Sequence, residues 1–226
     1  MTTALALRFS LPGLAAAVRA RMAGPGGYYN IGNGLGLVMG VAIQVATVPE
    51  GPTLTSGHAV LAAADYFAGS AAALALTLAT LIFCWSGEAY HRAWTAAKAP
   101  DPRLNRLGDH LSGIGALALG VALFLSGEPL LAATSGLLHA AGKFASALHF
   151  PGRAALPGWP SDWPDPFRGA VLLSRLPALL AAGLGIGAAL PDVLSGGPLL
   201  PLAAPATLLI CYLLWAKADL LLFRSA

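Results

Sequence analysis

The chain has 226 residues, of which 57% are hydrophobic and only 10% are charged, with a formal net charge of +3 and a mean hydropathy of +0.70. Soluble globular chains carry about 25% charged residues. The composition therefore excludes a water-soluble enzyme, a disordered tail and a nucleic-acid-binding protein that follows phosphates with Lys and Arg. It predicts an all-α, polytopic membrane protein that contacts membrane lipid and binds no nucleic acid.

Residues 1–29 are expected to lie on the cytoplasmic surface of the membrane rather than to cross it. The apolar stretch 9–18 contains Pro12 and Gly13 and is too short to span a bilayer. A cleaved signal peptide would carry its positive charge mainly before the apolar stretch, whereas two arginines follow this one. These features favour an interfacial helix. An organellar transit peptide stays an alternative, because no acidic residue precedes Glu50.

Six later segments are long and apolar enough to cross a bilayer core about 30 Å thick, which needs roughly 20 residues of helix. They are residues 30–47, 59–86, 107–125, 130–150, 170–190 and 199–223. The second is long enough to be tilted or broken near Gly69, and Pro191 is expected to end the fifth. Residues 30–226 are thus predicted to form one domain of six transmembrane helices, arranged as three in–out–in hairpins.

The basic residues predict the orientation of these spans. All Lys and Arg residues except Lys143 and Arg175 lie in segments on the side of the two termini, and those two lie in the halves of their spans nearer that side. The opposite side carries acidic residues such as Glu128 and Asp192 and neither Lys nor Arg. Because basic segments resist translocation, both termini are expected in the cytoplasm, with the chain in a bacterial inner (plasma) membrane.

Polar side chains share helical faces on several predicted spans. They are Asn33, Gly36, Gly40, Gln44 and Thr47 on the first span, Ser70, Thr77, Cys84, Glu88 and His91 on the second, Ser135, His139, Lys143 and Ser146 on the fourth, and Tyr212 and Asp219 on the last. Gly, Ser and Thr at such positions usually serve close helix packing. The ionisable groups are more informative, because placing them in hydrocarbon costs several kcal/mol.

His139 is the main candidate for a functional group, because it falls about nine residues into the fourth span and hence near the bilayer midplane. We expect it to be uncharged, since Lys143 lies one turn away on the same face. Its structural role would be a hydrogen bond to Asn33, Gln44 or a serine. The functional alternative is a pathway or ligand-binding site formed by His139, Lys143, Ser135, Asn33 and Gln44.

A second candidate set gathers at the cytoplasmic ends of the spans. Glu88, His91, Asp109, His110 and His149 fall at one depth if the helices pack antiparallel, and two histidines with a carboxylate suit a divalent metal. The alternative is that Glu88 and Asp109 pair with arginines such as Arg92, Arg103, Arg106 or Arg175. No HExxH, paired ExxH or CxxC motif favours the metal, so ion pairing is the preferred interpretation.

Three functions remain open from the sequence. The first is a small permease or channel for a small solute or ion, with His139 as a gate or proton relay. The second is a cofactor-binding or accessory subunit of a larger membrane complex, in which His139 with His110 or His91 ligates a haem or pigment. The third is a membrane enzyme with the metal centre described above. Small-residue faces also allow a homo-oligomer.

Overall fold

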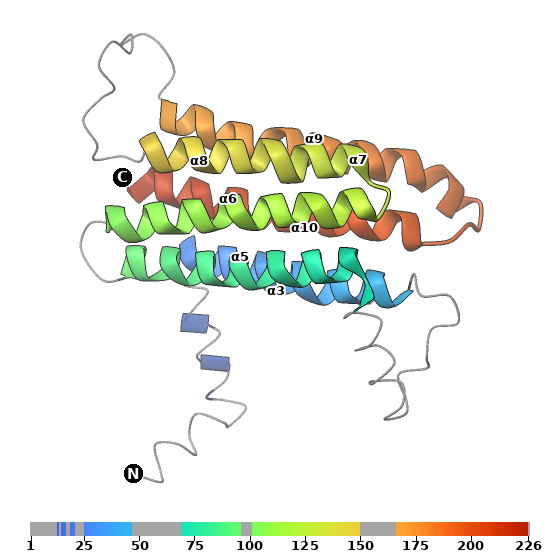
Figure 1. The fold of residues 1–226 in the computed structure, drawn as a ribbon, viewed down its shortest axis with the longest axis horizontal. Helices are drawn as coiled ribbons and strands as arrows, with labels where there is room; N and C mark the ends of the chain where they lie inside the picture. The colour runs from blue at the N-terminus through green and yellow to red at the C-terminus, as the bar shows by residue number, and fades with distance from the viewer. Residues whose placement is uncertain are drawn as a thin grey trace.

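The structure, a computed structural model, describes residues 13, 15–16, 19–20, 25–46, 69–95, 101–149 and 166–225. The helices in these ranges are α3 (Pro25–Ala46), α5 (Ala71–Thr95), α6 (Pro102–Leu125), α7 (Pro129–Leu131), η1 (Ala132–Leu138), α8 (His139–His149), α9 (Pro166–Leu194) and α10 (Leu200–Ser225). The π-helical η1 joins α7 to α8, so these three elements form one continuous rod (Figure 1). The all-α prediction is confirmed for the described part of the chain.

Within the described residues, four helices are long and apolar enough to cross a membrane. They are residues 71–94, 102–125, 168–194 and 200–221. Large apolar side chains such as Phe124, Leu184 and Leu220 are exposed on these helices, as lipid-facing residues are. The chain is therefore membrane-embedded. Apart from Pro25–Tyr29, which belong to α3, most of the predicted interfacial segment lies outside the described residues.

Local chemistry explains where two of the helices begin. Ser70 Oγ accepts a hydrogen bond from the backbone N–H of Ala73 at 3.3 Å, so it caps α5. The break predicted near Gly69 thus lies at the start of α5, and residues 59–68 lie outside the described ranges. Asp101 caps α6 by accepting from the N–H groups of Arg103 and Leu104, and a proline follows it at the first helical position.

Two glycines make the tight turns at the opposite helix ends. Gly127 (φ +82°) lies between α6 and α7, and Gly196 (φ +90°) lies between α9 and α10. The prediction that Pro191 ends the fifth span is wrong, because α9 continues to Leu194. The Pro191 carbonyl still accepts from the N–H of Ser195 at 3.1 Å, so the helix closes one further turn before Gly196 stops it.

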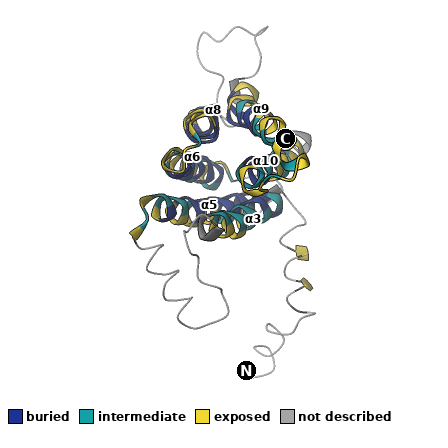
Figure 2. Cartoon of the chain, turned by 90° about the vertical axis from the view of Figure 1, so that its right-hand side faces the viewer, coloured by how far each residue is buried: buried dark blue, intermediate teal, exposed yellow. Residues whose placement is uncertain are grey.

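The described part of the chain thus forms six rods, namely the five long helices and the α7–η1–α8 rod, which pack as a closed ring. Each contacts two neighbours in the order α3, α5, α6, α8, α9, α10 and back to α3. Figure 1 shows the rods side by side, and Figure 2, turned by 90°, shows buried residues on the faces that meet inside the bundle.

The two ends of this ring differ in charge. In the described part of the chain, the end formed by the α6–α7 and α9–α10 turns carries Glu128 and Asp192 and neither Lys nor Arg; we call it the acidic end. The other end, called the basic end, carries residues such as Arg92, Arg103 and Lys217. This distribution agrees with the charge asymmetry seen in the sequence.

Candidate functional site

A layer of buried polar side chains crosses the ring near the basic end. Every rod contributes to this polar layer, and each member is at most 5% exposed. The members are Tyr29 (α3), Tyr90 (α5), Asn105, Asp109 and Ser112 (α6), Ser135, His139, Lys143 and Ser146 (η1 and α8), Arg175 (α9), and Tyr212 and Asp219 (α10).

The first half of the polar layer is organised around Asp109. Lys143 Nζ lies 3.2 Å from Asp109 Oδ1, and both side chains are only 2% exposed. Tyr90 Oη donates to the same oxygen at 2.5 Å, while Ser146 Oγ donates to Oδ2 at 2.8 Å. Because two buried charges are expensive unless they are paired and fully hydrogen-bonded, these donors hold the carboxylate in place. Lys143 Nζ also lies 5.1 Å from the ring centre of Tyr90, within cation–π range.

The second half is organised around Asp219. Arg175 Nε donates to Asp219 Oδ2 at 2.7 Å, and Tyr29 Oη donates to Oδ1. Arginine stays charged in proteins, so Asp219 is its matched counter-ion. The tyrosines join the two halves, because the rings of Tyr29 and Tyr90 stack with centroids 4.5 Å apart. The layer therefore contains two cations and two anions in one connected network.

His139 joins this network through Arg175. Arg175 Nη1 donates to His139 Nε2 at 3.3 Å, and Ser112 Oγ lies 3.4 Å from the same nitrogen. Because arginine has no acceptor, Nε2 of the neutral imidazole accepts and Nδ1 carries the proton. That proton is donated to Tyr212 Oη at 2.5 Å. The expectation of an uncharged His139 satisfied by hydrogen bonds fits this geometry, although Tyr212 and Arg175 supply bonds that were not foreseen.

The π-helical η1 segment explains how Tyr212 is held. The N–H of His139 bonds to the carbonyls of Thr134 and Gly136 and skips that of Ser135, four residues back. The Ser135 carbonyl accepts instead from Tyr212 Oη at 3.3 Å. Ser135 Oγ is buried without a hydrogen-bond partner among the described residues. Segments of π-helix often occur at functional sites, and this one lies directly before His139.

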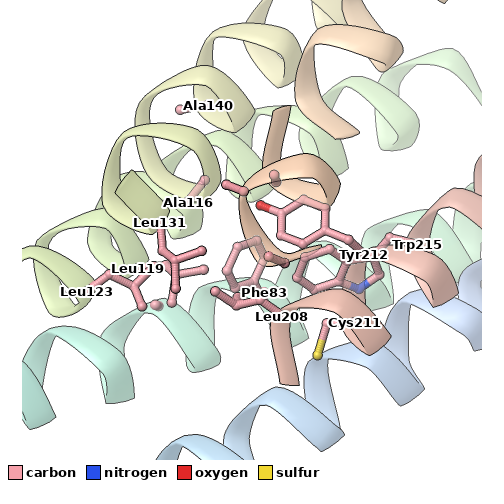
Figure 3. Packing of buried hydrophobic residues seen from close by; sticks show 14 of the residues in the cluster. Phe83, Ala116, Leu119, Leu123, Leu131, Ala140, Leu208, Cys211, Tyr212 and Trp215 are labelled. Atoms are coloured by element: carbon pink, nitrogen blue, oxygen red, sulfur yellow. The ribbon is translucent and has the colours of Figure 1, made fainter. Parts of the chain in front are cut away.

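A cavity of about 720 Å³ occupies the interior between α3, α5, α6 and α10. Its lining includes exposed residues of the acidic end, among them Ser126, Pro198 and Pro201, so it opens there. From this mouth it runs past Leu119 and Leu208 to Asn33, Phe83 and Trp215. Figure 3 shows Phe83, Leu208 and Trp215 close together in the apolar interior.

The cavity stops at the polar layer. The ring centre of His139 lies 6.1 Å from that of Phe83 and 5.7 Å from that of Trp215. The guanidinium carbon of Arg175 lies 5.6 Å from the Trp215 ring. The two aromatic residues therefore form a floor with the cavity on one side and buried charges on the other.

The structure divides the predicted pathway residues between these two regions. Asn33 lines the cavity together with Gly36 and Gly40, as the polar stripe on the first span predicts. His139, Lys143 and Ser135 belong to the polar layer. The side chain of Gln44 and all of Thr47 lie outside the described residues.

Of the polar line predicted on the second span, only Ser70, directly before α5, lines the cavity. Thr77 and Cys84 are exposed on the outer face of α5, whereas the cavity is lined by residues such as Leu76, Thr80 and Phe83. Thr77 can face outward at little cost, because its Oγ1 donates to the carbonyl of Ala73 at 2.8 Å and so needs no partner from another helix.

The four predicted metal ligands whose side chains the structure describes, Glu88, His91, Asp109 and His110, do not form a metal site. Among the described residues, no three His, Cys, Asp or Glu side chains form a group that would hold a metal ion. Glu88 pairs with Arg92 at 2.9 Å on the exposed side of α5, as the ion-pair alternative predicts. Asp109 pairs with Lys143 rather than with an arginine.

Neither of the two histidines of that set with a described side chain, His91 and His110, is among the buried residues of the polar layer. His110 is exposed beside Phe144, with ring centres 6.1 Å apart, and His91 is partly buried. The side chain of His149 lies outside the described residues.

A haem or pigment ligated by His139 does not fit the described residues. Both ring nitrogens already have partners, Nδ1 with Tyr212 and Nε2 with Arg175 and Ser112. A metal ligand needs one nitrogen free and unprotonated. The exposed His110 is not placed to face His139 across the bundle.

Sequence reasoning missed Arg175 and Asp219 as partners in the site. Both are ionisable residues inside predicted spans, so the argument that singled out His139 applies to them equally. Tyr29 and Tyr90 carry no such signal, because a tyrosine near a span end is usually an interfacial anchor.

Comparison with protein-family models, curated proteins and solved structures finds no match to this chain.

Proposed function

We propose that the protein is a membrane permease for a small solute, with the cavity as the solute site and the polar layer as the closed gate at the basic end. The observation that carries this proposal is the cavity that opens at the acidic end and stops at Phe83 and Trp215. A channel needs a continuous passage, whereas alternating access needs a site closed on one side at a time.

The proposal includes the membrane arrangement. The α3 helix and the α7–η1–α8 rod complete six crossings with the four apolar helices. The positive-inside rule places the basic end in the cytoplasm, so the cavity faces the outside. Opening the gate then requires the Lys143–Asp109 and Arg175–Asp219 pairs to separate or move with their helices.

Cysteine accessibility tests this proposal without knowledge of the solute. The native cysteines are replaced (Cys84→Ser, Cys211→Ser), and one cysteine is placed in the cavity (Thr80→Cys). Thr80 lines the cavity, and its hydroxyl donates only to its own helix at Leu76 O. A membrane-impermeant thiosulfonate is then applied to right-side-out and inside-out vesicles.

We expect rapid modification from the acidic end and slower modification from the basic end, because a permease exposes its site to both sides in turn. The matched control is Thr77→Cys, one turn away on the outer face, which should react from neither side. If Thr80→Cys never reacts from the basic end during prolonged exposure, the protein is not a permease of this kind.

A further inference from the structure

Away from the mouth, the polar side chains of the cavity wall are already used within the protein. Thr80 and Thr207 donate to carbonyls of their own helices at 2.9 and 2.6 Å. Asn33 Nδ2 donates to Phe83 O at 2.6 Å, and Cys211 Sγ donates to Gly32 O at 3.2 Å. A dehydrated inorganic ion or a sugar would therefore lose its water without finding replacement partners, which is costly. The remaining wall is mostly apolar and suits an organic molecule.

The charges around the cavity select among organic molecules. Glu128 is the single charged residue among the described residues that line it, and no described Lys or Arg forms an ion pair with it. The buried cations Lys143 and Arg175 each face an aspartate in the polar layer and do not line the cavity. An anion entering the cavity would therefore meet the Glu128 carboxylate at the mouth and no described cationic side chain on the wall.

We infer that the cavity binds an amphipathic organic cation whose positive group stays near Glu128 at the mouth and whose apolar body extends along the apolar wall toward the floor formed by Phe83 and Trp215. The orientation follows from Arg175, which lies 5.6 Å from the Trp215 ring and would repel a second cation at the floor. A volume of about 720 Å³ is in the range of small-molecule sites. This assignment of a solute class rests on the proposed function.

Three probes that share one apolar body test the inference: 1-naphthylmethyltrimethylammonium (cation), 1-naphthylmethanol (neutral) and 1-naphthylmethanesulfonate (anion). Binding is measured by equilibrium dialysis against the full chain in nanodiscs of zwitterionic lipid. We expect the cation to bind most tightly and the anion at least about tenfold more weakly. Glu128→Gln should weaken cation binding by a factor of about five and leave the neutral probe unchanged.

Matched glycine variants distinguish probe that binds inside the cavity from probe that partitions into the lipid. Gly36 lines the cavity and has room for a Cβ, 3.6 Å from Cys211 Sγ, while Gly34 is exposed with nothing within 4 Å. Gly36→Leu fills the cavity and should abolish saturable binding of the cation, whereas Gly34→Leu should retain it. If Gly36→Leu does not fold, Ala72→Leu (lining) and Ala71→Leu (exposed) form a second such pair.

Several results would overturn the inference: equal binding of cation and anion, no effect of Glu128→Gln, or equal binding by the filled and control variants. If none of the probes binds, as expected for a cavity occupied by the acyl chain of a bilayer lipid, the inference is overturned as well. Binding does not depend on transport. If the cation probe binds but Thr80→Cys reacts from one side only, the permease is refuted and the solute class stands. If Thr80→Cys reacts from both sides but the cation is not preferred, the solute class is refuted and the permease stands.

Discussion

At the scale of single residues, Lys143 and Asp109 show how an ionisable pair is accommodated inside an apolar bundle. Both lie within α-helices and both are nearly inaccessible, so neither charge is stabilised by bulk water. The pair is stabilised instead by Tyr90 and Ser146, which donate to Asp109. Removing one partner leaves the other charge buried without compensation, which is more costly than never having buried the pair.

We therefore expect Asp109→Asn to lower the free energy of unfolding by roughly 3–5 kcal/mol. The double variant Asp109→Asn/Lys143→Met should recover part of this loss, because no unpaired charge remains. Denaturant unfolding in detergent, followed by circular dichroism, measures both. The control is Arg92→Gln, which breaks an ion pair whose arginine is 67% exposed and should cost less than about 1 kcal/mol. Equal losses for Asp109→Asn and Arg92→Gln would contradict the buried pair.

The sequence identified some of these residues and not their partners. His139 and Lys143 stand out because they are ionisable and lie inside an apolar span, and both are buried as their shared helical face predicts. Their partners could not be read from the sequence. Lys143 meets Asp109 across 34 positions, and Arg175 meets Asp219 across 44. Such contacts depend on which helices are neighbours and how each is rotated.

At the scale of elements, the contact of α6 with η1 depends on two glycines. A Cβ on Gly136 would lie 2.6 Å from Gly120 Cα, and one on Gly120 would lie 2.9 Å from Gly136 Cα. The two backbones therefore meet directly, as small residues allow in membrane helices. This contact fixes η1 beside α6 and positions the adjacent His139 next to Ser112.

Gly136→Ala is expected to destabilise the protein by about 1–3 kcal/mol, since the backbones must separate to admit the methyl group. Gly183→Ala is the matched control, because nothing lies within 4 Å of a Cβ at that position of α9. There the alanine should be neutral or stabilising by up to about 1 kcal/mol through its higher helix propensity. Denaturant unfolding in detergent measures both variants. If Gly136→Ala leaves the free energy of unfolding unchanged, α6 and η1 are not in backbone contact.

At the scale of the whole molecule, the charge difference between the two ends predicts the orientation in the membrane. On the cysteine-free background (Cys84→Ser/Cys211→Ser), Ser126→Cys and Ser195→Cys at the acidic end should react with an impermeant maleimide in intact cells. Arg103→Cys at the basic end should react only after permeabilisation. All three positions are exposed, so differences in burial do not explain the result. Labelling of Arg103→Cys in intact cells would reverse the orientation and turn the cavity toward the cytoplasm.

The sequence by itself determined the membrane class, the all-helical fold and the approximate positions of the helices. These follow from apolar length and composition, which are local properties of each segment. It also determined the charge of each end, because basic and acidic residues are already separated along the chain.

Only the tertiary structure decided which polar residues meet. The outward turn of Thr77, the pairing of Asp109 with Lys143 and the cavity that stops at Trp215 all depend on helix rotation and neighbour order. A helical face repeats every 3.6 residues whichever side it presents to the ring. The face pattern of a segment therefore shows which residues lie together, and only packing against other helices settles whether they face lipid, a cavity or a buried charge.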